Sequence, residues 1–395
     1  MKARTLTIVS VLALLVAAGV VSAAELSPLE SLGKSIFFDQ NLSINSNQSC
    51  AACHAPEVGW TGPDANINMQ GAVYEGSIAG RFGNRKPPAS AYATFSPIFF
   101  FSRQGGGMFL GGNFWDGRAT GEKLGNPAAD QAQGPFLNPL EQALPDPAAV
   151  VSIVCTSIYQ GLFRQVWGSD ACDSGAAYDY IALSIAAYEA SREVSPFSSK
   201  YDAYLAGKAT LTTIERDGLA LFKGKAKCAR CHVSTGKAPL FTDFTYDNLG
   251  VPRNPDNPFY TELEFNPLGA AWIDLGLGGF LESRSDYAEY AKKNMGKFKV
   301  PTLRNVDKRP SSDFVKAYGH NGYFKSLKEI VHFYNTRDLL PTCLPGSPGE
   351  KMTCWPLPEL ALNMNTKEVG NLGLTNAEEE AIVAFLRTLS DGYMP

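Results

Sequence analysis

The chain contains the sequence CAACH at residues 50–54 and a second copy of the same pattern, CARCH, at residues 228–232. C-x-x-C-H is typical of covalent attachment of a c-type haem. Each thiol can bond to a haem vinyl group, while the adjacent histidine supplies a nitrogen ligand to the iron. We therefore predict two covalent haems. The attachment residues are Cys50 and Cys53 with iron ligand His54, and Cys228 and Cys231 with iron ligand His232.

Two other uses of a C-x-x-C pair have to be weighed, a zinc site and a disulfide. The pair alone would leave both open. A histidine directly after both pairs argues against them.

The N-terminus has the pattern of a secretory signal peptide. Lys2 and Arg4 precede an apolar stretch over residues 6–20, and the small residues 21–23 form a cleavage pattern. An uncleaved membrane anchor is the alternative, but the apolar stretch is short for a bilayer span. We predict a signal peptide over residues 1–23 and a periplasmic protein with no membrane span after cleavage.

Length and charge restrict the organisation and the partners. Without the two basic residues of the signal segment, 33 basic and 39 acidic residues remain. A net negative chain argues against a nucleic-acid partner, which requires a basic face. The length allows two domains, and the separation of the haem motifs suggests one haem in each. We predict an N-terminal cytochrome c-like domain over residues 24–205, carrying the first haem, and a C-terminal one over residues 206–395, carrying the second.

The helix signals repeat in the two halves. Capping boxes at residues 27–30 and 212–215 each precede a G-x-x-[IL]-F sequence and then a haem motif. Closing helices are expected at residues 176–193 and 375–389, the second beginning with a third capping box at residues 375–378. The link between the halves is expected at residues 194–208. The intervening sequence is rich in Gly and Pro and poor in strand patterns. The predicted fold is mainly α and loop-rich, with two c-type cytochrome-like domains.

Four cysteines remain after the haem thiols are assigned. Their spacings of 17 and 11 residues predict the disulfides Cys155–Cys172 and Cys343–Cys354. An oxidising compartment would permit both bonds. Buried free thiols are the alternative.

The histidines indicate an open position at the first iron. No histidine lies between His54 and His232, so the first half offers no second imidazole. Met69 and Met108 could bind iron, but a methionine in a loop more often serves packing. The first haem is therefore expected to be open to peroxide or another small ligand.

Four further stretches resemble the bacterial di-haem cytochrome c peroxidases and their MauG branch. They are FWDGR at residues 114–118, DQAQGPFLNPLE at 130–141, KVPTLRNV at 299–306 and HNG at 320–322. The resemblance covers essentially the whole mature chain. It implies that Trp115 relays electrons between the haems and that Gln131 and Glu141 line the peroxide side of the first haem. Compared with the family pattern, this chain has about six extra residues, around 121–129, between the tryptophan motif and the glutamine motif.

The chemistry of peroxide supports a role for Glu141. Heterolysis of the O–O bond needs a proton moved from the iron-bound oxygen to the leaving oxygen, and a carboxylate above the haem can move it. The alternative is a solvated loop carboxylate. Read without the resemblance, Trp115 would more often be a core aromatic residue.

The sixth ligand of the second haem separates the branches of the family. The resemblance implies a methionine fourteen residues after the HNG histidine in ordinary peroxidases and a tyrosine in the MauG branch. That register reaches Tyr334. Phenolate is a hard anionic donor that favours ferric iron and higher oxidation states. The alternatives are that Tyr334 only packs and that His332 or Met352 binds the iron.

The resemblance also implies a calcium ion between the haems. The matching positions are Asn84, through its side chain, and Val315 and Ala317, through their carbonyls. The sequence around Asn84 departs from the R-N-x-P motif of the family. The carbonyl positions also carry side chains that differ from those of the family, which a backbone ligand tolerates, but the residues alone do not indicate oxygen-only coordination.

Together these features predict an oxidoreductase that uses hydrogen peroxide. The MauG-like function is oxidation of a residue on a periplasmic partner protein through a high-valent di-haem state. The alternative is a cytochrome c peroxidase that reduces peroxide to water with electrons from a small cytochrome c or cupredoxin. A more distant alternative is a non-enzymatic electron-transfer cytochrome, against which Gln131 and Glu141 argue.

Overall fold

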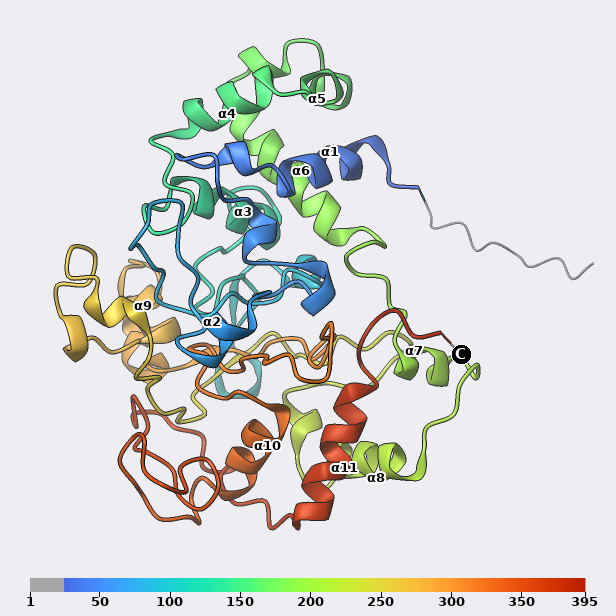
Figure 1. The fold of residues 1–395 in the computed structure, drawn as a ribbon, viewed down its shortest axis with the longest axis vertical. Helices are drawn as coiled ribbons and strands as arrows, with labels where there is room; N and C mark the ends of the chain where they lie inside the picture. Colours follow the sequence, from blue (N-terminus) through green and yellow to red (C-terminus); the bar gives the residue numbers. More distant parts are fainter. Residues whose placement is uncertain (1–24, 395) are drawn as a thin grey trace, which may run out of the picture.

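The computed structural model describes residues 25–394, so the predicted signal peptide lies outside the described residues. The described chain is mainly helical and rich in loops, as predicted (Figure 1). The α-helices are α1 Pro28–Phe37, α2 Ala65–Met69, α3 Pro127–Leu137, α4 Pro147–Thr156, α5 Gln160–Trp167, α6 Ala177–Ala190, α7 Lys200–Leu205, α8 Thr213–Lys223, α9 Gly276–Glu282, α10 Leu327–Thr336 and α11 Asn376–Arg387.

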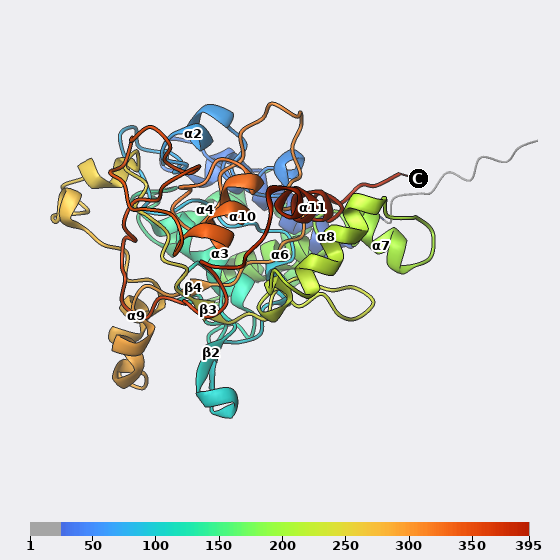
Figure 2. The same cartoon turned by 90° about the horizontal axis from the view of Figure 1, so that it is seen from below.

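Short 3-10 helices and strands fill part of the loops. The 3-10 helices are η1 Gln40–Leu42, η2 Cys50–Ala52, η3 Pro56–Val58, η4 Ala93–Phe95, η5 Gln104–Gly106, η6 Ala171–Asp173, η7 Cys228–Arg230, η8 Pro258–Thr261, η9 Gly269–Ala271 and η10 Ala288–Asn294. The strands are β1 Phe100–Ser102, β2 Met108–Leu110, β3 Tyr246–Asp247 and β4 Phe298–Lys299. β1 pairs antiparallel with β2, and β3 with β4. The β1–β2 hairpin projects from the molecule in Figure 2.

The three predicted capping boxes are present. Ser27, Thr212 and Thr375 each accept a hydrogen bond from the backbone three residues later and begin α1, α8 and α11. These reciprocal bonds satisfy N–H groups that have no partner within the helix. The closing helix of the first half, α6, ends at Ala190, three residues before the predicted end. The predicted link contains α7, capped by Ser199, which the sequence analysis did not predict.

Each half packs its opening helix against its closing helix, α1 on α6 and α8 on α11 (Figure 1). A glycine makes each close approach possible. A Cβ atom at Gly33 would lie 1.9 Å from the Ser184 carbonyl oxygen, and one at Gly218 would lie 1.9 Å from the Ala381 carbonyl oxygen. The glycine of each G-x-x-[IL]-F sequence therefore sets the helix spacing, and the sequence repeat is also a structural repeat.

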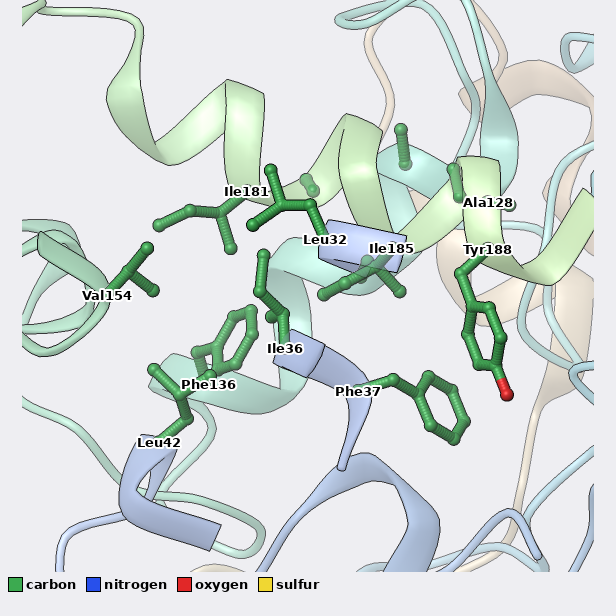
Figure 3. Packing of buried hydrophobic residues seen from close by; sticks show 14 of the residues in the cluster. Leu32, Ile36, Phe37, Leu42, Ala128, Phe136, Val154, Ile181, Ile185 and Tyr188 are labelled. Atoms are coloured by element: carbon green, nitrogen blue, oxygen red, sulfur yellow. The ribbon is translucent and has the colours of Figure 1, made fainter. Parts of the chain in front are cut away.

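Two large apolar clusters follow this division. The first contains Leu32, Ile36 and Phe37 of α1 facing residues of α6 (Figure 3). The second joins α8, α10 and α11, and it begins in the chain at Tyr201. We call residues 25–199 the first half and residues 200–394 the second half. The division into two cytochrome-like domains at residues 205 and 206 stays a prediction.

The two predicted disulfides are confirmed, Cys155–Cys172 in the first half and Cys343–Cys354 in the second. The four cysteines of the C-x-x-C-H motifs form no disulfide. Within residues 25–394, no helix has both the length and the apolar character needed to cross a bilayer.

Candidate active site

The first C-x-x-C-H motif lies on the wall of a cavity of about 1110 Å³. Helix η2 carries Cys50, and the turn after it brings Cys53 and His54 to the same cavity. The His54 amide donates to the Cys50 carbonyl at 3.0 Å, which closes this turn. The two thiols and the imidazole that the motif would use to hold a haem therefore face one shared space.

The orientation of His54 suits an iron ligand. Its Nδ1 donates to the Trp60 carbonyl oxygen at 3.2 Å. This hydrogen bond puts the ring proton on Nδ1 and leaves Nε2 with a free lone pair, as in histidines that bind metals. Burial lowers the pKa of His54 to about 4, partly offset by its hydrogen bonds to backbone carbonyls. The ring is therefore neutral at physiological pH, which is the form that can bind iron.

The second motif repeats this arrangement. His232 Nδ1 donates to the Phe241 carbonyl oxygen at 2.8 Å, and burial lowers the pKa of His232. Cys228, His232 and Tyr334 lie on the walls of two adjoining cavities of about 980 and 970 Å³. Cys231 lines the first of these two cavities. We treat them together as the second cavity.

Unpaired polar atoms on the cavity walls test whether haem fits. Among the described residues, few buried side-chain nitrogen or oxygen atoms have no hydrogen-bond partner. Three of them belong to cavity residues, namely Gln48 and Gln142 at the first cavity and His320 at the second. Buried polar atoms without partners are costly. The two glutamine atoms are oxygens, which need a donor, whereas the largely apolar linings of both cavities suit the large apolar ring of haem.

Gln131 and Glu141 meet at the first cavity, as the sequence analysis predicts. Gln131 lies on α3, while Glu141 follows the end of α3 at Asn138. The Glu141 backbone is held at both ends, since its N–H donates to the Asn138 carbonyl and its carbonyl accepts from Ser77. Burial raises the pKa of Glu141, opposed by the charge of Arg118 and a hydrogen bond with Asn138. A raised carboxyl pKa is typical of catalytic acids and bases.

Trp115 lies between the two sites. It lines the first cavity, the second cavity and a smaller one of about 740 Å³ that joins His54 and Gln131 to Pro301. Its indole N–H donates to the Lys86 carbonyl at 2.8 Å. The N–H of Lys86 in turn donates to the carbonyl of His320. The tryptophan is thus held where the halves meet.

Ion pairs hold the loop that carries Trp115. Arg85 pairs with Asp116 of the WDGR motif and with Asp274 of the second half, both at 2.6 Å. Burial opposes ionisation of Asp116, but Arg85 and Arg118 lower its pKa. Breaking one partner of such a buried network is strongly destabilising.

The candidate sixth ligands of the second iron differ in whether their side chains line the second cavity. Tyr334 lines the second cavity. His332 does not, and both its ring nitrogens are engaged elsewhere, Nδ1 with Glu379 at 2.9 Å and Nε2 with the Met352 carbonyl at 3.0 Å. The Met352 side chain is 67% exposed and lies outside the cavity linings. His320 is the competitor that the sequence analysis did not weigh, because it lines the same cavity.

Neither methionine considered for the first iron lines the first cavity, although one tyrosine, Tyr74, does. Met69 and Met108 are exposed and are absent from its lining. Glu189, which the sequence analysis missed, does line it. Burial raises the pKa of Glu189 to about 8. A carboxylate near the end of the largely apolar helix α6 was the signal that could have revealed it.

The donors at the predicted calcium positions do not by themselves fit a calcium ion. Asn84 lines the first cavity and Ala317 the second. The Val315 carbonyl already accepts from the Asn68 amide at 3.1 Å. The charged side chains next to these positions in the chain are cationic, whereas calcium prefers anionic oxygen ligands. Calcium at this site stays a prediction, and no step below uses it.

Comparisons with known proteins agree with this geometry. Residues 27–210 match the family described as "Di-haem cytochrome c peroxidase". The chain is 36% identical to the methylamine utilization protein MauG of Paracoccus denitrificans, over 92% of this chain and 88% of that protein. It is 29% identical to the cytochrome c551 peroxidase of Nitrosomonas europaea, over 83% of each chain.

A solved structure shows the same fold. The crystal structure of the diheme peroxidase BthA from Burkholderia thailandensis superposes with a TM-score of 0.75 at 30% identity, covering 93% of this chain and 87% of that one. The chain therefore belongs to the di-haem cytochrome c peroxidase family, whose members are oxidoreductases with two haems.

Proposed function

We propose that this protein is a MauG-like enzyme, which uses hydrogen peroxide to oxidise a residue on a partner protein. The first haem is attached through Cys50 and Cys53, with His54 as its iron ligand. The second is attached through Cys228 and Cys231, with His232 and Tyr334 as ligands. One observation carries this proposal, namely that Tyr334 lines the second cavity while His332 and Met352 do not. When bound, the haems supply the iron that peroxide oxidises and store the oxidising equivalents.

Glu141 moves the proton in this proposal. As a carboxylate it takes the proton from bound peroxide, and as the acid it returns that proton to the leaving oxygen, which departs as water. Its raised pKa supports this role, because a carboxyl that titrates nearer neutral pH exchanges protons more readily. Gln131 orients the peroxide by hydrogen bonding.

Trp115 couples the two sites. Its position on the walls of both cavities supports a relay of electrons between them. Its hydrogen bond to Lys86 holds the indole in one orientation.

The partner is a periplasmic protein. The predicted signal peptide and the two disulfides support an oxidising compartment outside the cytoplasm. The net negative charge argues against a nucleic-acid partner.

A second candidate is a cytochrome c peroxidase that detoxifies peroxide. The names of several relatives favour it, including the cytochrome-c peroxidase IdrP2 of Pseudomonas sp., which is 28% identical over 91% of this chain and 80% of that protein. Rapid peroxide-dependent oxidation of a reduced small cytochrome or cupredoxin would support this candidate over the first.

The test of the proposal is a low-temperature EPR spectrum of the ferric holoprotein. We expect one high-spin and one low-spin haem, with the low-spin signal altered by Tyr334→Phe. His332→Gln is the matched control on the same helix, and it should leave the signal unchanged. A low-spin signal that Tyr334→Phe leaves intact would assign the ligand to another residue, with His320 the next to test.

A further inference from the structure

Three aromatic rings pack together beside the first haem motif. Phe37 and Trp60 have ring centroids 5.7 Å apart, Trp60 and Tyr188 5.8 Å, and Phe37 and Tyr188 5.6 Å. Figure 3 shows Phe37 and Tyr188 side by side at the end of the apolar cluster. All three side chains are almost fully buried. We call Phe37, Trp60 and Tyr188 the first ring triad.

The first triad adjoins the haem site. The carbonyl of Trp60 is the acceptor for His54 Nδ1. Phe37 lines the first cavity. The Trp60 ring therefore packs against Phe37, a residue of the cavity wall. The backbone carbonyl of the same tryptophan orients the iron ligand His54.

A second ring triad occupies the equivalent place in the second half. Phe222 and Phe241 are 6.1 Å apart, Phe241 and Phe385 6.2 Å, and Phe222 and Phe385 5.2 Å. The carbonyl of Phe241 is the acceptor for His232 Nδ1. The two triads thus have the same contacts and nearly the same spacing.

The backbone establishes the correspondence between the triads. Trp60 and Phe241 both have left-handed φ, of 63° and 54°. A Cβ at Gly33 would meet the Cβ of Tyr188 at 2.9 Å, and a Cβ at Gly218 would meet the Cβ of Phe385 at 2.9 Å. Trp60 therefore matches Phe241, and Tyr188 matches Phe385.

The chemical difference lies in which rings can be oxidised. Indole and phenol give up one electron far more readily than the benzene ring of phenylalanine. A phenol must also lose its proton, because its radical cation is a very strong acid. The Tyr188 hydroxyl donates to Glu193 at 2.8 Å, and Glu193 pairs with Lys34 at the surface, where both side chains are more than a third exposed. The first triad thus combines two oxidisable rings with a proton acceptor.

The second half has a tyrosine near its triad but no such acceptor. Tyr201 packs against Phe241 at 5.6 Å and Phe385 at 5.4 Å. Within residues 25–394, no hydrogen bond is formed by its hydroxyl, although it is almost fully buried. Tyr201 therefore has no hydrogen-bonded carboxylate that could take its phenol proton as Glu193 can at Tyr188.

We propose that Trp60 and Tyr188 form a second route by which electrons reach the first haem, independent of Trp115 and the second haem. In each step Tyr188 would give up one electron, and Trp60 would pass that electron on to the oxidised first haem site. The phenol proton passes along its hydrogen bond to the Glu193 carboxylate, which becomes a carboxylic acid. A one-electron reductant in solution then reduces the neutral tyrosyl radical, and the proton returns from Glu193.

This route is a discharge path for the first haem. It lets small soluble reductants quench the oxidised site when no protein partner is bound, and so limits oxidative damage inside the molecule. The inference rests on the proposed function in one respect, that peroxide oxidises the haem held by His54.

The test uses the holoprotein mixed with hydrogen peroxide without any donor and frozen within milliseconds to seconds. EPR should show a free-radical signal that narrows when the protein contains ring-deuterated tyrosine. Tyr188→Phe should abolish the tyrosyl signal, and Trp60→Phe should reduce it severalfold. Both variants install residues that the second triad already contains at the same positions. Glu193→Gln keeps the surface polar but removes the proton acceptor, so it should also lower the signal.

Tyr201→Phe is the matched control, since it removes a buried tyrosine from the other ring cluster and should leave the signal unchanged. A tyrosyl signal that survives Tyr188→Phe, or a wild-type protein without one, would overturn the route. The optical spectrum of the haem separates this failure from that of the proposed function, because a spectrum that does not respond to peroxide overturns both. If a variant fails to bind haem, peptide mapping of the peroxide-treated wild type decides, with oxidation of Trp60 or Tyr188 expected and its absence contradicting the route.

Discussion

The two haem cavities share one backbone plan but differ in the side chains that face them. In each, a histidine follows a C-x-x-C turn and donates through Nδ1 to a backbone carbonyl. Glu141 and Gln131 face only the first cavity. Tyr334 and His320 face only the second. The repeat therefore gives both cavities the same C-x-x-C-H backbone frame, and a few side chains outside the repeat make the two cavities chemically different.

The two ring triads behind the cavities also combine a shared arrangement with different side chains. The ring spacings of the two triads are similar, yet only the triad in the half that carries Glu141 contains Trp and Tyr. Packing requires aromatic rings at these positions, but it does not require Trp or Tyr. The difference therefore lies in redox chemistry and not in the fold.

The largest expected effect comes from removing the acid and base of the first cavity. Glu141→Gln should slow the reaction with peroxide by about 10²–10⁴-fold, which is the usual contribution of a positioned proton carrier. Stopped-flow measurement of the haem absorbance checks this rate. Glu122→Gln, at a more exposed carboxylate paired with Arg284, is the control and should react like the wild type.

The same variant tests the pKa of Glu141. The base must be ionised, so the rate should rise with pH through a pKa that lies above the ordinary value of 4.5. This limb of the profile should be absent in Glu141→Gln. If Glu141→Gln left the rate and its pH dependence unchanged, Glu141 would not be the group that distinguishes the first cavity from the second.

The next largest effect is on stability, and it concerns the glycine that lets the opening helix pack closely on the closing helix in each half. Gly33→Ala and Gly218→Ala each place a methyl group 1.9 Å from a backbone carbonyl, so each should destabilise the protein by about 3 kcal/mol or more. Thermal unfolding of the holoprotein measures the loss. Gly161→Ala on α5 is the control, because a Cβ there meets nothing within 4 Å. A large loss in only one half would break the structural equivalence.

A smaller effect is expected when the second cavity receives the methionine that the resemblance implies for ordinary di-haem peroxidases. Tyr334→Met should raise peroxide-dependent oxidation of a reduced small cytochrome by about tenfold, or about 1.4 kcal/mol, because a thioether ligand raises the haem potential. Steady-state donor oxidation measures the gain. Val331→Met adds a methionine to the same cavity without removing the phenol, and it should show no gain. Equal turnover in both variants would count against ligation by Tyr334.

The smallest effect compares the disulfides of the two halves. Loop-closure entropy assigns about 3 kcal/mol to each bond, with the 17-residue separation worth about 0.4 kcal/mol more than the 11-residue one. Replacing both cysteines of a pair by serine should therefore cost slightly more at Cys155 and Cys172 than at Cys343 and Cys354. Chemical unfolding of the two double variants measures the difference, and the reverse order would show that the bonds differ in more than loop length.

Much of this protein could be predicted from local sequence patterns. The C-x-x-C-H motifs act through residues on one turn, and the capping boxes act over three residues, so no distant contact is needed to recognise them. The disulfide pairs close short loops for the same reason. The family motifs also brought Trp115, Gln131 and Glu141 to notice before the structure placed them on the cavity walls.

The remaining decisions depend on residues far apart in the chain. His332 and Tyr334 are two positions apart on α10, and only the packing of that helix shows that His332 turns to Glu379 and Tyr334 to the cavity. Helix α7 lies in a segment expected to be a link, and it is stabilised by its packing against the second half. The ring triads each join three separate segments. Sequence by itself determined the groups that can hold two haems, because those signals are local, whereas tertiary structure decided which side chains face each haem, because that depends on how distant segments pack.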